Sequence, residues 1–423
     1  MSAPELLRTG RGIDRSGDRT VSVGGLAIAA AYLLAAGLML VTGGATTSPW
    51  LTLHLALAGG ASVAIAAMLP FFAAALVAAP PAPTRQRVAA VGLIAAGAAI
   101  VTTGVHAGDA RVGAAGGAVY LAGMALLAMV TLRLLRGSII ARRRIFGVLY
   151  GVALGCVLAG ATLSTLMLAG VPAIAAAWST LRIAHAWLNL FGFVGLIVAA
   201  TLIHFLPTVV GSRIEQGRRT VAGISAAAAG PPVVAAGLIL GVWPVLAAGV
   251  ALVAAGAVWL VAYTADVLRR RARWTTDPGW HRFTTGSMTC AIGWLVVAEV
   301  GAGAVALAHG PGPAGWVGGA VVLPLVVGAI VQLIVGSWSH LLPAIGPGGP
   351  VRHAWQRRVL GRWATVRLGA FQAGVAALLI GAAGGLGGPV DATGRLLVAV
   401  PLVVSVGLLA AALVGGRQQG GTG

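Results

Sequence analysis

Residues 180–210 have the sequence TLRIAHAWLNLFGFVGLIVAATLIHFLPTVV, and Arg182 is the one residue in this run that is charged at neutral pH. A helix needs about 20 apolar residues to cross a hydrocarbon core of roughly 30 Å. A helix also satisfies its own backbone hydrogen bonds, which lipid cannot do. The run therefore predicts a transmembrane helix that ends at Leu206-Pro207.

Similar apolar runs recur along the whole chain. Of its 423 residues, 58% are hydrophobic and 9% are charged, which is too little charge to cover a soluble domain of this size. We predict an all-α polytopic membrane protein with about twelve transmembrane helices embedded in the lipid bilayer. The predicted spans are 21–43, 50–78, 87–105, 112–135, 145–170, 180–210, 220–241, 243–265, 283–308, 316–342, 364–386 and 395–414.

The arginines predict the orientation of these spans. The net charge is +19, and all 28 basic residues are arginines. All but Arg111, Arg182 and Arg395 lie before the first span or after an even-numbered one, as the positive-inside rule requires. This placement argues against nucleic acid as a partner. It predicts a multi-pass protein of the cytoplasmic membrane with an Arg-rich cytoplasmic segment (1–20), a single transmembrane domain (21–414) and a cytoplasmic tail (415–423).

A Leu-Pro ending recurs in every fourth span. It occurs at Leu69-Pro70, Leu206-Pro207 and Leu342-Pro343, so the prolines are 137 and 136 residues apart, close to one third of the chain. Proline often terminates a helix, but a regular interval is not expected from termination alone. The interval favours three pseudo-repeated four-helix units over the two-half plan of many transporters.

Two histidines occupy equivalent places in this scheme. His54 and His185 lie at the predicted outer starts of the second and sixth spans, where two imidazoles could ligate haem iron from both sides or hold copper. Asn189 follows His185 by four residues, on the same helical face, and could orient the ring. The alternative is that each histidine meets water at the membrane interface and that Asn189 joins two helices.

Three further side chains are candidates because ionisable groups are costly inside a bilayer. His204 and His340 end the sixth and tenth spans and predict a second, inner metal or cofactor pair; ordinary interfacial histidines are the alternative. Glu299 lies well inside the ninth span and is a proton relay candidate, or else a hydrogen-bonding link between helices. No catalytic motif is visible, so no catalytic residue is predicted.

Short motifs resemble a known group of proteins. Residues 185–195, HAWLNLFGFVG, resemble the HxHLNLxGWVG helix in the membrane regions of actinobacterial copper-oxidase or nitrite-reductase-like fusion proteins. Residues 54–60, HLALAGG, resemble their HLxLLGA helix, and residues 339–343, SHLLP, resemble the end of their tenth span. These regions are distantly similar to haem–copper oxidase subunit I and to NnrS membrane proteins.

The resemblance implies twelve spans in three four-helix arcs, with His54 as a haem ligand and His185 as a copper ligand. Ile183 replaces the first histidine of HxHLN, and the seventh span has no histidine pair, so a complete oxygen-reducing centre is not expected. The expected function is a haem- or copper-binding membrane protein with a role in electron transfer or nitrogen-oxide metabolism and a redox partner protein. The alternatives are a twelve-helix small-molecule transporter, or a structural or assembly protein without cofactors.

Overall fold

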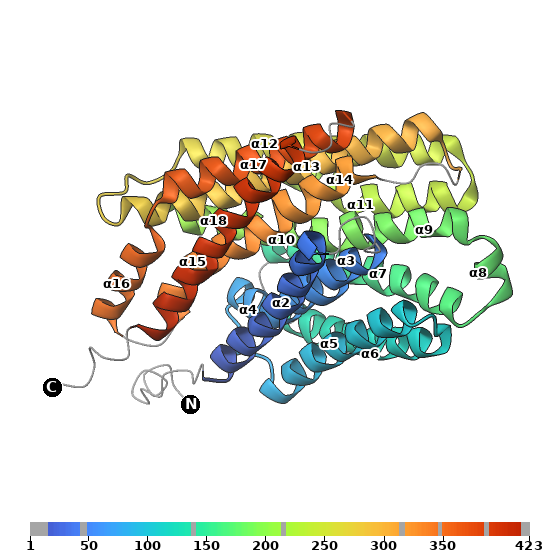
Figure 1. Cartoon of the computed structure of the whole chain (residues 1–423), viewed down its shortest axis with the longest axis horizontal. Helices are drawn as coiled ribbons and strands as arrows, with labels where there is room; N and C mark the ends of the chain where they lie inside the picture. The colour runs from blue at the N-terminus through green and yellow to red at the C-terminus, as the bar shows by residue number, and fades with distance from the viewer. Residues whose placement is uncertain are drawn as a thin grey trace. The chain divides into compact units, whose positions relative to one another are not determined.

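The computed structural model describes residues 16–42, 49–136, 141–212, 217–312, 318–345, 349–384 and 389–415. Every regular element in these ranges is a helix (Figure 1). Twelve of the helical segments are long and apolar enough to cross a membrane, as predicted. The predicted terminal segments lie largely outside the described residues, and the orientation and the single domain over residues 21–414 stay predictions.

Nine spans are continuous α-helices. They are α2 (Ser16–Thr42), α5 (Thr84–His106), α6 (Ala110–Arg136), α7 (Ala141–Leu168), α11 (Arg218–Leu240), α12 (Trp243–Arg269), α13 (Pro278–His309), α17 (Ala364–Gly384) and α18 (Pro389–Val414). Two short helices, α8 (Pro172–Ala176) and α16 (Pro350–Leu360), lie outside the spans.

The second, sixth and tenth spans each contain a π-helical segment between two α-helical parts, which the sequence analysis did not predict. They are α3 (Pro49–His54), η2 (Leu55–Ala61) and α4 (Ser62–Val77); α9 (Trp178–Trp187), η3 (Leu188–Gly195) and α10 (Leu196–Val210); and α14 (Gly319–Leu323), η4 (Pro324–Val331) and α15 (Gln332–Ile345). The Leu-Pro pairs lie within the last α-helical part of each span. Wide π-turns are rare and often occur at functional sites.

A glycine in each π-segment packs against a side chain of the span before it. An added Cβ on Gly328 would lie 2.5 Å from Trp294 Cγ, and one on Gly192 would lie 2.8 Å from Cys156 Sγ. A Cβ on Gly59 would clash with the ring of Tyr32 in the same way. These three contacts join spans 1 and 2, 5 and 6, and 9 and 10, so the same helix pair recurs at four-span intervals.

The remaining spans form three closely packed hairpins: α5 with α6, α11 with α12, and α17 with α18. Glycines bring the two backbones of each hairpin together. A Cβ on Gly97, Gly237 or Gly374 would collide with the backbone of the partner helix. Small residues allow this close packing of membrane helices. A continuous span, a span that contains a π-segment and a helical hairpin therefore follow one another three times along the chain. This order agrees with the predicted repeat of four helices.

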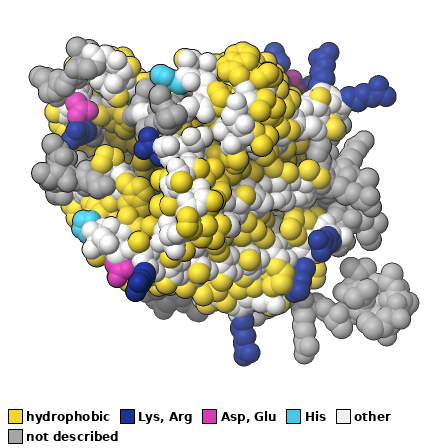
Figure 2. Space-filling model, turned by 90° about the vertical axis from the view of Figure 1, so that its right-hand side faces the viewer, with side chains coloured by type: hydrophobic (Ala, Val, Ile, Leu, Met, Phe, Trp, Pro, Cys, Tyr) yellow, Lys and Arg dark blue, Asp and Glu magenta, His cyan; other side chains and the backbone are white. Residues whose placement is uncertain are grey.

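The chain forms two compact units, one up to Gly147 and one from Val148 onward. In the first unit, Tyr120 Oη and Ser62 Oγ are 2.8 Å apart in the core, and Tyr32 donates to Ala95 O at 2.7 Å. In the second unit, the α9–η3–α10 span buries a larger share of its residues than any other described span. Apolar side chains dominate the surface seen in Figure 2, as expected for helices that face lipid.

Candidate functional site

His185 lies near the end of α9, and its ring is oriented by helix α7. Its Nδ1 is 2.8 Å from the carbonyl oxygen of Gly160. A carbonyl can only accept a hydrogen bond, so Nδ1 carries the proton and donates it. The lone pair of the neutral ring is then on Nε2. Histidines that ligate metals in proteins are commonly held in this way by a backbone carbonyl.

Asn189 contacts His185 through its backbone, and its predicted role in orienting the ring stays a prediction. Its Nδ2 donates to the His185 carbonyl oxygen at 2.7 Å. The same nitrogen is 3.2 Å from His185 Nδ1, but Nδ1 already donates to Gly160, so we interpret the 3.2 Å approach as packing between two donors. Gly160 leaves the space for this amide, since a Cβ there would clash with Asn189 Nδ2. Gly160 therefore holds the His185 imidazole, and Asn189 holds the His185 backbone beside it.

His54, in the first unit, has a similar local environment. It is the last residue of α3 and directly precedes η2, and its Nδ1 is 2.8 Å from the carbonyl oxygen of Trp50. The Trp50 ring stacks on the His54 ring at 4.0 Å between centroids, with an interplanar angle of 23°. His185 also has a tryptophan neighbour, Trp178, at 5.9 Å. In each histidine, Nδ1 is therefore hydrogen-bonded to a backbone carbonyl oxygen, and the ring lies beside the indole of a tryptophan.

Glu299 lies on α13 beside the end of η3. Its Oε1 would be 3.7 Å from a Cβ built on Gly195, the last residue of that π-segment. No hydrogen bond or ion pair joins Glu299 to the part of the chain that the structure describes. Both the proton relay and the hydrogen-bonding link between helices stay predictions.

At the arginine-rich ends of the spans, His340 lies in an aromatic cluster. Its ring stacks on Trp280 of α13 at 5.0 Å with an interplanar angle of 11°, and Phe205 of α10 meets it edge-on at 5.6 Å. The ends of the sixth and tenth spans therefore meet, as the predicted inner pair requires. The ring seen against His340 is that of Phe205, the residue after His204, so the metal role of the pair stays a prediction.

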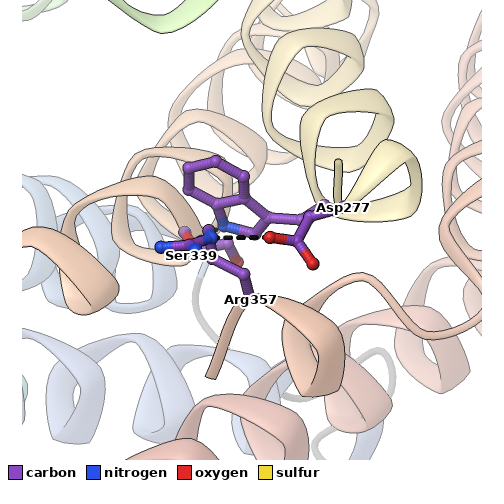
Figure 3. A network of polar contacts seen from close by, with 4 residues as sticks. Asp277, Ser339 and Arg357 are labelled. Atoms are coloured by element: carbon purple, nitrogen blue, oxygen red, sulfur yellow. Dashed lines mark hydrogen bonds and ion pairs between the residues drawn. The ribbon is translucent and has the colours of Figure 1, made fainter. Parts of the chain in front are cut away.

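A polar network holds Trp280 in place (Figure 3). Its Nε1 donates to Ser339 O at 2.6 Å, and the guanidinium of Arg357 from α16 lies 5.8 Å from its ring centroid. Arg357 Nε also donates to Asp277 Oδ2 at 2.7 Å. The His281 ring stacks on Trp274 at 5.0 Å between centroids and meets Trp280 edge-on. The network joins α13, α15 and α16. We call Trp280, Ser339, Arg357 and Asp277 together the Trp280 clamp and interpret it as structural.

Sequence reasoning missed Gly160 and the Trp280 clamp. Trp50 could have been found, because it is four residues before His54 and shares its helical face. Nothing distinguishes Gly160 from the other 63 of the 64 glycines in the sequence. The start of α13 at Asp277-Pro278 could have been predicted, since an acidic residue followed by a proline commonly begins a helix.

Within the described ranges, no three His, Cys, Asp or Glu side chains are grouped so that they could hold a metal ion. Haem requires fewer ligands from the protein, because the porphyrin supplies four nitrogens and the protein supplies one or two axial ligands. The donor set at His185 fits such an axial ligand.

The chain was compared with known proteins in three ways. It matches no family model, and no curated protein or solved structure shows significant similarity to it.

Proposed function

We propose that this membrane protein binds haem and works in electron transfer, with His185 Nε2 as an axial ligand in the second unit and His54 Nε2 as a separate candidate ligand in the first unit. The hydrogen bond from His185 Nδ1 to Gly160 O is the main support. It sets the tautomer and orientation that a ligating imidazole needs and increases the basicity of Nε2. The sequence resemblance to haem- and copper-binding membrane regions points in the same direction.

Haem is a better match than copper for the described residues. One imidazole with a fixed tautomer satisfies an axial position, whereas a copper centre usually takes three or more protein ligands. When bound, haem would supply reversible one-electron chemistry. The residues of this chain would hold and orient it: Gly160 and Asn189 position His185, and Trp50 positions His54.

The test is a reduced-minus-oxidised visible spectrum, with iron and copper analysis, of detergent-purified protein from cells supplied with both. We expect a haem signal that is lost or shifted in His185→Ala and in His54→Ala. His309→Ala is the matched control, because this histidine is exposed at the end of α13. Added imidazole should restore the spectrum of His185→Gly, which separates loss of a ligand from misfolding. Colourless, metal-free wild-type protein would exclude the proposal.

Glu299 favours a second candidate, a transporter with a proton pathway. A carboxyl in a span, beside a π-segment and without a hydrogen bond in the described ranges, is a typical candidate for such a path. In proteoliposomes containing a pH-sensitive dye, an imposed membrane potential should then drive proton uptake that Glu299→Gln abolishes. Asp391→Asn, at the exposed start of α18, should leave that uptake unchanged. Equal uptake with and without the protein would exclude this candidate.

A further inference from the structure

A small cavity lies in the second unit between α13, α15, α17 and α18. Its polar lining consists of Ser287, Gln332, Arg367 and Ser405, and its walls include the ring of Phe283. Its volume, measured as the space open to the centre of a water-sized sphere, is about 20 Å³, which is room for about one water molecule or one ion of similar size. The cavity therefore suits water or an ion of few atoms.

Gln332 places a buried amide at this cavity. It is the first residue of α15, and 5% of its surface is exposed. Neither its Oε1 nor its Nε2 is hydrogen-bonded to any residue that the structure describes. Burying an amide without a hydrogen bond is unfavourable, and buried polar groups in proteins almost always have a partner. The amide therefore points to an occupant of the cavity.

Arg367 adds a positive charge to the same cavity. It is 4% exposed and donates to Arg362 O at 3.0 Å, Leu360 O at 2.5 Å and Ser405 Oγ at 3.0 Å. A guanidinium has more N–H groups than these bonds use. No ion pair within the described ranges involves Arg367, although its guanidinium lies 3.7 Å from the ring centroid of Phe283.

Its carbonyl partners come from the end of α16 and the residues just after it, where the helix dipole contributes only a partial negative charge. A buried cation without a full counter-charge is costly. Arg362 is exposed at the same end of the bundle, and Arg282 donates to Thr365 there, so the surroundings are also positive. Such a field raises the local concentration of anions.

We propose that the cavity binds a small monovalent inorganic anion of about halide size, held by the Arg367 guanidinium and the Gln332 amide Nε2. Water alone would satisfy the amide but would leave the charge uncompensated. The rest of the cavity lining is apolar, which favours a weakly hydrated anion over a phosphate. This proposal is independent of haem, because no histidine is among the described residues that line the cavity.

The test uses the full chain in detergent at constant ionic strength, with bromide or chloride replacing gluconate, which is too large for the cavity. Line broadening of the ³⁵Cl nuclear magnetic resonance signal measures binding directly, and the thermal unfolding midpoint measures its effect on stability. For the wild type we expect saturable broadening that bromide competes away, together with a rise in the midpoint. The site would be excluded if the broadening of the chloride signal did not saturate. It would also be excluded if the thermal unfolding midpoint were the same in chloride and in gluconate.

Three variants locate the anion. Gln332→Leu removes the amide at similar volume and should weaken binding about tenfold or more, as expected for a lost hydrogen bond to a charged group. Gln332→Glu keeps the shape but supplies its own negative charge, and should abolish binding. Gln356→Leu is the control, because it removes a buried amide that does not line the cavity. Unchanged chloride binding in both Gln332 variants would contradict the proposal.

Discussion

Gly160 and His185 are joined by a 2.8 Å hydrogen bond between two helices, and the same glycine leaves the space that the Asn189 amide occupies. One small residue therefore controls both the orientation and the support of the imidazole. A side chain at this position would displace the Asn189 amide.

Gly160→Ala should displace Asn189 and reorient His185. Overpacking of this kind typically costs about 1–3 kcal/mol of unfolding free energy. We expect a lower thermal midpoint and, if haem is bound, a changed spectrum. Gly155→Ala on the same helix is the control, since nothing lies within 4 Å of a Cβ there. Equal midpoints for the two variants would contradict the observed packing.

Gly59→Ala should destabilise the first unit, because the new methyl group meets the ring of Tyr32. We expect a loss of about 1–3 kcal/mol. Tyr32→Leu in the same chain should recover part of it, since the two positions are in contact and their effects are not additive. Gly92→Ala, at a position with open space, should be close to neutral. Thermal unfolding of the wild type, Gly59→Ala, Tyr32→Leu and the double variant measures the coupling, and strictly additive effects would count against the contact.

Asp277→Asn should weaken the clamp around Trp280. The Asp277–Arg357 pair is partly buried, with side-chain exposures of 14% and 31%, so we expect a loss of about 1 kcal/mol. Asparagine tolerates the left-handed backbone at this position, where φ is 47°, so the change tests the charge and not the backbone. The more exposed pair Asp391–Arg395 is the reference, and Asp391→Asn should stay within about 0.5 kcal/mol of the wild type.

Trp280→Phe should remove one hydrogen bond and keep most of the ring packing. Ser339 O would lose the Nε1 donor at 2.6 Å, at a cost of about 1–3 kcal/mol for a buried carbonyl left without this partner. His340 should still stack on the smaller ring. Thermal unfolding of the variant and the wild type checks the energy. A variant as stable as the wild type would show that the bond contributes little.

Sequence patterns were sufficient for the spans and for their interval, because lipid imposes both length and apolarity on every crossing helix. The Leu-Pro spacing also led to the four-helix repeat. Sequence patterns did not reveal the π-segments, since Gly59, Gly192 and Gly328 have no signal until their partners on another helix are known. They identified His185 and Asn189 as a pair but not Gly160, and they gave no sign that Arg367 is buried.

The three π-segments also affect the rotational phase of their spans. A π-turn contains one residue more than an α-turn, and one residue corresponds to about 100° around a helix axis. In the sixth span, residues after Gly195 therefore face directions that counting from His185 along a regular helix would not give. Deleting one residue within η3 would turn Phe205 and the Leu206-Pro207 ending away from their present neighbours. The π-segment thus determines which residues at one end of the span lie on the same helical face as those at the other end.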